Sequence, residues 1–346
     1  MRCEWGDLIS LEYGKPVSDK DSVNGKYPVF GTNGQIGTSN LPPLCPHSSF
    51  VIGRKGAYRG VHYSDVPFSV IDTAFYVESK KPDILDIKWA YYKFLTYDIN
   101  HMDSGSAIPS TDRYEIYSID VDLPSIDVQK KIAAILSALD EKIAINRAIN
   151  DNLEQQAFAL FDSLFPRTID GSQTIGDYII PKRGRNLLSK DAVYGAVPVV
   201  AGGLEPSTYH NVANTKAPVL TISASGANAG FVNLWLNPVW SSDSSYIDSS
   251  MTPNVFFWYI LLKGRQKEIF DAQTGSAQPH IYPQHIAAMP IGNLNQESVS
   301  QFTTQVAPLF ELIGANKDEN ERLSNIRDAL LPKLMSGEID VSAVKL

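Results

Sequence analysis

The sequence predicts an α/β fold in which two repeated, mainly β globular domains are separated by two long helices that form an antiparallel coiled coil. Residues 132–164 and 302–334 both carry seam positions at strictly alternating steps of four and three, the spacing by which one helix packs lengthwise against another. The second stretch begins 170 residues after the first, and much of the remaining chain repeats at the same offset. A globular part followed by a long helix is therefore the repeated unit.

Each helical stretch has two asparagines in the middle of its seam. A buried asparagine lowers stability but finds a partner only in the correct register, so we expect these four residues to fix the register. A helix of this length spans roughly 50 Å, which is longer than either globular part requires. We therefore expect a spacer; packing of each helix on its own domain is the simpler alternative. The seam positions are Ile132, Leu136, Leu139, Ile143, Asn146, Asn150, Leu153, Ala157, Leu160 and Leu164, then Phe302, Val306, Leu309, Ile313, Asn316, Asn320, Leu323, Arg327, Leu330 and Leu334.

Local signals mark the ends of both helices. Pro124 precedes the first helix and Pro166 ends it, whereas Asn295 can cap the second and Gly337 stops it. Pro308 lies inside the second seam, where its ring and missing N–H predict a kink or a new helix start. Antiparallel packing would place the globular domains at opposite ends of the helix pair, around an approximate two-fold axis through the asparagines.

Short apolar runs bounded by Gly, Asn and Ser predict strands in both globular parts. The expected strands are 27–30, 49–52 and 68–77, repeated as 197–200, 219–222 and 246–247, and the expected helices are 88–95 and 255–262. The predicted divisions are a first domain at 1–124, a central helix at 125–166, a second domain at 167–292, and a C-terminal helix and tail at 293–346.

Composition narrows the class of protein. The 346 residues are 43% hydrophobic and 20% charged, as in a globular domain, and no apolar run approaches the roughly 18 residues of a membrane span. Two cysteines without a CxxC pair, and no histidine cluster at ligand spacing, indicate a reducing cytoplasm and no structural metal. The net charge of −8 argues against bulk affinity for nucleic acid, although a focused basic site is compatible with it.

Common enzyme signatures are absent from the sequence. It has no P-loop, HExxH, GxSxG or the Asp/Asn-Pro-Pro-Tyr tetrapeptide of amino-methyltransferases. The glycines of residues 31–37 are best interpreted as a turn. Asp72 and Asp243 lie near the ends of probable strands, where capping a turn is a more frequent role than catalysis. No catalytic residue and no metal ligand is therefore predicted.

Cationic and hydroxyl side chains in the loops indicate contact with DNA. Arginine and lysine bind phosphates, and arginine reads guanine bidentately; an ordinary solvated loop remains the alternative for any single residue. The loop at 53–56 contains Arg and Lys, whereas the corresponding loop at 223–226 contains Ser and Ala, so two different half-sequences are expected. The candidate DNA-binding residues are Thr32, Asn33, Arg54, Lys55, Tyr58, Arg59, Ser104, Ser106, Ser110, Arg113, Lys182, Arg183, Arg185, Ser223, Ser225, Asn228, Thr274, Ser276, Gln278, His280 and Tyr282.

The central helix carries the runs Gln-Lys-Lys-Ile-Ala-Ala-Ile-Leu at 129–136 and Leu-Asp-Glu-Lys-Ile at 139–143. With these runs as the most specific part, the helix strongly resembles that of the specificity subunits of type I restriction–modification systems. Trp-Gly-Asp-Leu at 5–8, Tyr-Pro-Val at 27–29, Gly-Ser-Ala at 105–107 and Leu-Leu-Pro-Lys-Leu-Met-Ser-Gly-Glu-Ile at 330–339 extend the resemblance over essentially the whole chain.

This resemblance implies two target recognition domains, each reading half of a bipartite sequence in double-stranded DNA. It further implies docking of two methyltransferase subunits, which bring S-adenosylmethionine and methylate adenine, and of restriction subunits that use ATP and Mg²⁺. The chain itself would have no active site. Two other hypotheses remain at this stage: a coiled-coil scaffold that bridges two protein partners, and a free-standing enzyme.

Overall fold

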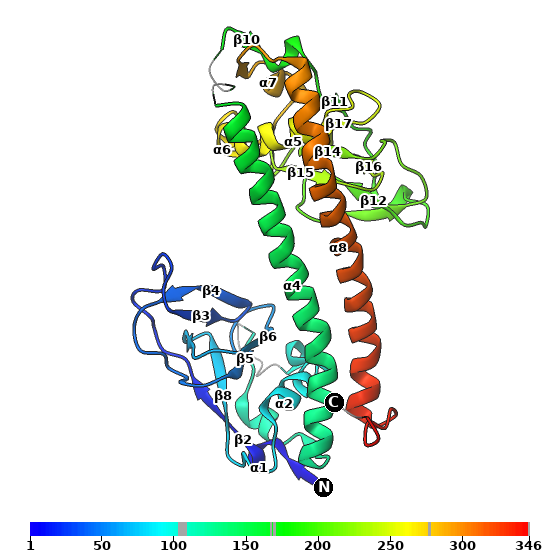
Figure 1. Cartoon of the computed structure of the whole chain (residues 1–346). Helices are drawn as coiled ribbons and strands as arrows, with labels where there is room; N and C mark the ends of the chain where they lie inside the picture. Colours follow the sequence, from blue (N-terminus) through cyan, green and yellow to red (C-terminus); the bar gives the residue numbers. More distant parts are fainter. Residues whose placement is uncertain (103–108, 167, 169–170, 276–277, 345–346) are drawn as a thin grey trace. The chain divides into compact units, whose positions relative to one another are not determined.

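The computed structural model describes residues 1–102, 109–166, 168, 171–275 and 278–344. It contains two compact units, one formed by Met1–Ile143 with Glu321–Leu346 and the other by Ala144–Asn320. Each unit, termed here unit 1 and unit 2, combines a globular part with a section of both long helices (Figure 1). No helix within the described ranges is long and apolar enough to cross a membrane.

Unit 1 is built on a four-stranded antiparallel sheet with the order β2-β8-β5-β6. A second sheet has the order β4-β3-β7, and β1 pairs with β9. Its strands are β1 (Arg2–Glu4), β2 (Ile9–Tyr13), β3 (Tyr27–Gly31), β4 (Gly34–Ser39), β5 (Ser49–Gly53), β6 (Val61–Ser64), β7 (Ser69–Val70), β8 (Ala74–Ser79) and β9 (Asp120–Asp122). Its short helices are α1 (Trp5–Leu8), α2 (Ile87–Phe94), the 3₁₀ turn η1 (Ile99–His101) and α3 (Arg113–Tyr117).

The core of unit 1 lies between the four-stranded sheet and the long helices. Trp89 and Phe94 of α2 are fully buried together with Phe50 of β5. The Asp86 carboxylate caps α2 by accepting a hydrogen bond of 2.7 Å from the Trp89 backbone N–H. Leu136 and Leu334 belong to the same hydrophobic cluster, so the long helices complete this core.

Unit 2 repeats this topology, which confirms the internal repeat. Its sheets have the orders β11-β17-β14-β15 and β13-β12-β16, and β10 pairs with β18. The strands are β10 (Gln173–Thr174), β11 (Lys182–Arg183), β12 (Val197–Val200), β13 (Thr208–His210), β14 (Val219–Ser223), β15 (Val232–Trp235), β16 (Trp240–Ser241), β17 (Ser244–Asp248) and β18 (Pro290–Ile291). The helices are η2 (Ile175–Asp177), η3 (Ser189–Asp191), α5 (Val255–Gly264), α6 (Gln266–Asp271) and α7 (Pro283–Ala287).

The repeat extends to single backbone contacts. The isolated β-bridge between Lys55 and Ser110 in unit 1 recurs in unit 2 as the bridge between Ser225 and His280. Both units thus hold the loop after a central strand against the segment that precedes a short helix. In unit 2, α5 is buried on all sides from Val255 to Leu262, as expected for a helix enclosed by a sheet and two neighbouring helices.

The two long helices are α4 (Ile126–Leu164) and α8 (Gln296–Ser336). The predicted ends of α8 are confirmed: Asn295 Oδ1 accepts a hydrogen bond of 3.0 Å from Ser298 N, and Gly337 follows with a φ of +77°. The expectation of a new helix start at Pro308 is wrong, because α8 runs unbroken through it. Thr304, whose carbonyl loses the usual N–H donor, lies on the exposed side of the helix, so water can take the place of that donor.

The helices pack antiparallel along the predicted seam. In unit 2, Asn146 Nδ2 donates to Asn320 Oδ1 at 2.9 Å, and Asn316 Nδ2 donates to Asn150 Oδ1 at 2.8 Å. These contacts pair the beginning of one helical section with the end of the other. Most seam positions are buried or half-buried, but Leu164, at the end of α4, is 47% exposed. The predicted fold class is therefore confirmed.

Candidate nucleic-acid interface

Two arginines in unit 1 stack on one tyrosine ring. The Arg54 guanidinium carbon lies 4.7 Å from the centre of the Tyr13 ring, and that of Arg113 lies 5.1 Å from it. Arg54 also donates to the Asp72 carbonyl at 2.9 Å, and Arg113 donates to the Tyr114 hydroxyl at 3.1 Å. Among the described residues neither arginine forms an ion pair, so both keep a net positive charge available for an anion.

The backbone fixes the loop that carries Arg54. Backbone N–H groups of Arg54 and Lys55 both donate to the Thr73 carbonyl, at 2.9 and 3.0 Å. The Thr32 hydroxyl reaches the Thr73 and Lys55 carbonyls at 2.7 and 2.9 Å. Gly53 is required here, because a Cβ at this position would lie 2.8 Å from the Arg59 Cα. Thr32 therefore positions the loop through its side chain.

Three further predicted residues of unit 1 are exposed around this loop. Asn33 and Lys55 are exposed, and Tyr58 is 64% exposed. His62 lies beneath the turn that carries Asn33, and burial lowers the pKa of its imidazole. The ring is therefore neutral at pH 7 and adds no charge to this surface. Ser110 bridges to Lys55 through its backbone.

Arg59 is a correction to the sequence analysis. Its side chain is only 2% exposed, and its Nη2 donates to the carbonyls of Ile99 and Asn100 at 3.3 and 2.6 Å. This arginine holds η1 against the loop after β5 and does not face a nucleic acid. An arginine in a glycine-rich turn is usually exposed, and only the fold shows that another segment covers this one.

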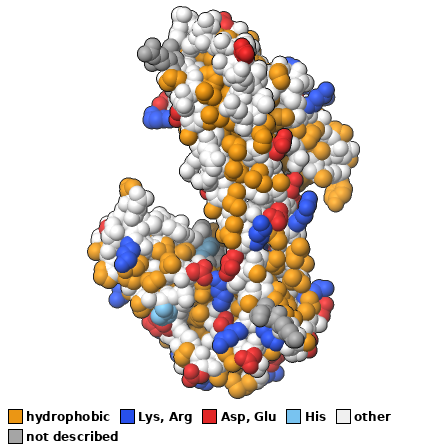
Figure 2. Space-filling model, in the orientation of Figure 1, with side chains coloured by type: hydrophobic (Ala, Val, Ile, Leu, Met, Phe, Trp, Pro, Cys, Tyr) orange, Lys and Arg blue, Asp and Glu red, His pale blue; other side chains and the backbone are white. Residues whose placement is uncertain are grey.

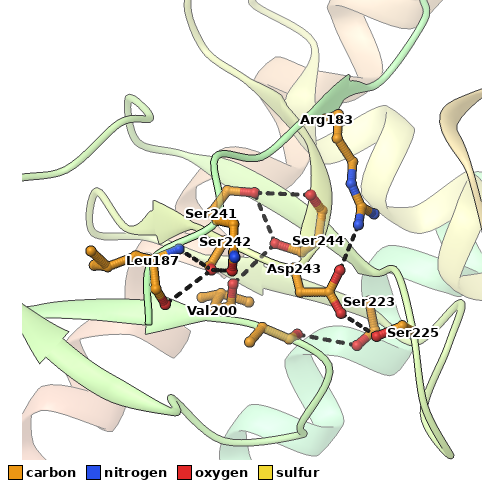
Figure 3. A network of polar contacts seen from close by, with 11 residues as sticks. Arg183, Leu187, Val200, Ser223, Ser225, Ser241, Ser242, Asp243 and Ser244 are labelled. Carbon is orange, nitrogen blue, oxygen red and sulfur yellow. Dashed lines mark hydrogen bonds and ion pairs between the residues drawn. The ribbon is translucent and has the colours of Figure 1, made fainter. Parts of the chain in front are cut away.

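In unit 2 the corresponding place holds an ion pair (Figure 3). Arg183, which occupies the position of Tyr13 in the repeat, donates to Asp243 Oδ1 at 2.5 Å. The Ser225 hydroxyl donates to the other carboxylate oxygen of Asp243. The Arg183 and Asp243 side chains are 42% and 33% exposed, so the pair presents a cation and an acceptor together.

Buried serines lie beside this ion pair (Figure 3). The Ser241 and Ser244 hydroxyls lie 2.8 Å apart, and the Ser244 hydroxyl donates to the Val200 carbonyl at 3.2 Å. Leu187 N donates to the Ser242 hydroxyl at 2.9 Å. The hydroxyls thus satisfy buried polar groups where strands meet. Ser223, predicted to bind DNA, is also buried and donates to the Ala201 carbonyl at 3.2 Å, so that prediction is wrong.

An aromatic pair lies next to Ser225. The rings of His280 and Tyr282 stack at 5.9 Å with an angle of 18° between their planes, and Tyr282 is 44% exposed. Backbone hydrogen bonds between Thr274 and His280, at 3.0 and 2.8 Å, close this loop. Exposed residues of this part of unit 2 that were also predicted are Lys182, Arg185 and Gln278; Asn228 is half-buried. Ser104, Ser106 and Ser276 lie outside the described residues.

The structure therefore brings some of the predicted residues together in two clusters, Arg54 with Arg113 in unit 1 and Arg183 with Ser225 in unit 2. The clusters add Tyr13, Tyr114 and Asp243, which the sequence did not place at a binding surface. The repeat offset offered a signal for Tyr13, since it corresponds to Arg183. Asp72 and Asp243 are one position out of register with the repeat, since they lie 171 residues apart, and each contacts an arginine: the Asp72 backbone carbonyl accepts from Arg54, and the Asp243 carboxylate accepts from Arg183. On the face drawn in Figure 2, Lys and Arg occur in small groups among Asp and Glu, in keeping with local binding sites.

Comparisons with known proteins show what this chain is similar to. The family model for the type I restriction modification DNA specificity domain matches residues 3–155. A putative type I specificity subunit of Mycoplasma pneumoniae is 25% identical, covering 95% of this chain and 94% of its own length. The specificity subunit of the type I restriction enzyme MjaIX of Methanocaldococcus jannaschii is 26% identical over 73% of this chain and 69% of its own length.

A solved structure shares the fold. The S subunit of a type I restriction–modification system from M. genitalium superposes with a TM-score of 0.62 at 21% identity, covering 96% of this chain and 95% of that one. Residues 3–155 thus match a DNA specificity domain. The chain as a whole is similar over most of its length to specificity subunits of type I restriction–modification systems, a class of protein that is not itself an enzyme.

Proposed function

We propose that unit 1 and unit 2 each read one half of a split sequence in double-stranded DNA, through the two clusters described above. The observation that carries this proposal is the different chemistry at corresponding places of one scaffold. Unit 1 offers two arginines on a tyrosine, neither of them ion-paired within the described part of the chain, and unit 2 offers an arginine paired with an aspartate. Different chemistry on the same backbone selects different base pairs.

The chemistry of the unit 1 cluster favours binding of guanine or of a phosphate group. Stacking on Tyr13 restrains Arg54 and Arg113 without consuming all of their N–H donors. A guanidinium held in this way can donate both bonds that the O6 and N7 of guanine accept. The exposed Lys55 and Tyr58 add phosphate contacts at the edge, which position the domain without sequence information.

The unit 2 cluster combines a donor with an acceptor. The Asp243 carboxylate is the type of group that accepts a hydrogen bond from the N4 amine of cytosine, and Arg183 beside it can donate to the paired guanine. The stacked rings of His280 and Tyr282 present an apolar edge that fits a thymine methyl group. We therefore assign this half of the target a G·C pair with an adjacent A·T pair.

The partner subunits supply the chemistry in this proposal. Two adenine methyltransferase subunits bring S-adenosylmethionine, and restriction subunits bring ATP and Mg²⁺. The net charge of −8 and the small size of both cationic groups mean that the chain alone binds DNA weakly. Such a complex acts on genomic DNA, so we propose that it is located in the cytoplasm. The role of α4 and α8 as a spacer stays a prediction.

Methylome sequencing tests this proposal. A host that expresses this chain with its methyltransferase should carry modified adenine in a split motif, and a contiguous motif would refute two separate readers. Arg54→Ala should relax one half of the motif, whereas Arg183→Ala should relax the other, each by about 1–3 kcal/mol of discrimination. Arg2→Ala, which removes an exposed arginine paired with Asp120, is the matched control and should leave both halves unchanged.

A further inference from the structure

Unit 1 contains a cluster of a thiol, an imidazole and a carboxylate outside the DNA-binding loops. Cys45 and His47 lie in the segment before β5, and Glu78 lies on β8. His47 Nε2 is 2.9 Å from Glu78 Oε2, and Cys45 Sγ is 4.0 Å from Glu78 Oε1. One potential ligand atom from each residue lies within 4.8 Å of the other two, and no second group of this kind occurs among the described residues.

We propose that Cys45, His47 and Glu78 bind one zinc ion, or another divalent transition-metal ion that accepts sulfur, nitrogen and oxygen ligands together. Zinc takes thiolate at about 2.3 Å and imidazole or carboxylate at about 2.0–2.2 Å. In a tetrahedral site these bond lengths place ligand atoms about 3.3–3.6 Å apart. The separations of 2.9 Å from His47 Nε2 to Glu78 Oε2 and 4.0 Å from Cys45 Sγ to Glu78 Oε1 lie on either side of this range, so rotations of the three side chains would complete the site.

The orientation of His47 fits such a site. Its other ring nitrogen, Nδ1, lies 3.2 Å from the Ser48 carbonyl and 3.7 Å from Cys45 Sγ. A proton on Nδ1 that is donated to this carbonyl leaves the lone pair on Nε2, which is the nitrogen that faces Glu78. Histidine ligands commonly use the second nitrogen in this way, because the backbone carbonyl then fixes both the tautomer and the ring plane.

The neighbourhood supplies a fourth position and a rigid base. A cavity of about 410 Å³ lined by His47, Glu78, Asp86 and Lys130 opens on the imidazole and carboxylate side and can hold a water ligand. Cys45 is fully buried, and its backbone pairs with Phe68 through two hydrogen bonds of 2.9 and 3.0 Å. Three protein ligands with a water in the fourth position is a familiar zinc arrangement.

The repeat provides an internal comparison. The positions of Cys45, His47 and Glu78 correspond to Thr215, Ala217 and Asp248 in unit 2. There the Thr215 hydroxyl donates to the Val239 carbonyl at 2.8 Å, and Asp248 accepts from the Lys216 backbone N–H at 2.8 Å. The same scaffold is thus held together by ordinary hydrogen bonds in unit 2. The thiol and the imidazole of unit 1 are an addition that the scaffold itself does not require.

The site would join the segment before β5 to β8 of the main sheet. Cys45 belongs to the small hydrophobic cluster of Phe30, Val51, Phe68, Val70 and Ala74, and Glu78 lies on the strand at its side. A metal ion at this place would link that cluster to the sheet. We therefore assign the ion a structural role that is separate from reading DNA. This proposal differs from the sequence-based expectation of no structural metal.

Metal content and cobalt spectroscopy of the full chain test the site. Purified protein, equilibrated with Zn²⁺ and then dialysed, should retain about one ion per chain, and Co²⁺ should give the intense near-ultraviolet absorption of a thiolate–cobalt bond. Cys45→Ser should abolish this absorption and lower zinc affinity at least tenfold, whereas Cys3→Ser, which removes the only other cysteine, should change neither. His47→Gln should weaken binding of both ions.

Two outcomes would overturn the proposal. One is wild-type protein that retains no zinc and shows no thiolate–cobalt absorption, a result that does not depend on whether any variant folds. The other is metal binding that persists unchanged in Cys45→Ser, which would indicate an adventitious ion only. Thermal unfolding of the wild type with and without a chelator gives an independent measurement, since a structural ion should raise Tm.

Discussion

Asn146 at the centre of the helix pair allows the sharpest test of how register is specified. Its side chain is fully buried, and its Nδ2 donates to Glu319 Oε2 at 2.6 Å and to Asn320 Oδ1 at 2.9 Å. Its Oδ1 is buried without a hydrogen-bond partner among the described residues. The substitution Asn146→Leu removes the two donated bonds and this unpaired oxygen together.

The balance of these terms favours leucine. The lost bonds are worth roughly 1 kcal/mol for the neutral partner and roughly 2 kcal/mol for the carboxylate. Removal of the unpaired oxygen raises the free energy of unfolding by about 1–3 kcal/mol. Burial of the leucine side chain raises it by about 1.5–3 kcal/mol more. We therefore expect a net stabilisation of about 1 kcal/mol, which raises Tm by about 2–4 °C in a unit of this size.

Differential scanning calorimetry measures this shift in Tm, and light scattering after gel filtration measures whether the variant forms oligomers. In the wild type, a wrong register or self-association leaves the buried asparagines without partners, whereas an apolar centre removes this penalty. We therefore expect Asn146→Leu to form oligomers, and the double variant Asn146→Leu with Asn320→Leu to form more of them. Arg147→Leu, on the exposed neighbour, is the control and should change the free energy of unfolding by less than about 0.5 kcal/mol. A fall in Tm for Asn146→Leu with the control unchanged would refute this reasoning.

Two further predictions concern the core of unit 1. Burial raises the pKa of Tyr91 to about 12, and since the unfolded chain ionises at about 10, its contribution is present below about pH 10 and lost between about pH 10 and 12. The free energy of unfolding from urea titration should therefore fall between about pH 9 and 11, and by about 1 kcal/mol less in Tyr91→Phe; an equal fall in both proteins would contradict the assignment. Arg327 donates to Asp140 at 2.8 Å, with both side chains about one-third exposed. Arg327→Met should destabilise unit 1 by about 1 kcal/mol in urea unfolding. Asp328 is the more exposed partner of Arg327, so Asp328→Asn should have almost no effect. Equal effects of the two substitutions would show that the contact with Asp140 is not what stabilises the unit.

The periodic features of the fold could be predicted from the sequence because they are local. Steps of four and three place seam residues on one side of a helix wherever that helix lies, and Asn146 and Asn316 are accordingly buried. The repeat at an offset of 170 residues could also be found without knowing any contact, because it is visible when the sequence is compared with itself. Helix α2 was predicted within one residue at each end. Pro308 was the exception, since an exposed carbonyl in a long helix tolerates the lost donor.

The sites could be predicted only in part, because they depend on pairing between distant segments. Arg54 and Arg113 lie 59 positions apart in the sequence, and their shared contact with Tyr13 arises from strand pairing and a loop crossing. Arg59 and Ser223 have ordinary turn chemistry in the sequence, but neighbouring segments cover them. The cluster of Cys45 and Glu78 was missed for the same reason, since β8 supplies the carboxylate from outside the local motif.

The asparagine centre unites the repeat with the antiparallel packing. Residue Asn316 is the repeat of Asn146, and Asn320 is the repeat of Asn150. The bond from Asn146 to Asn320 therefore becomes the bond from Asn316 to Asn150 when the repeats are exchanged, and both are present at nearly equal length. Helices packed parallel would instead pair each asparagine with its own repeat. The four side chains thus fix the register of the antiparallel pair, and their two hydrogen bonds are exchanged by the same approximate two-fold axis that exchanges the repeats.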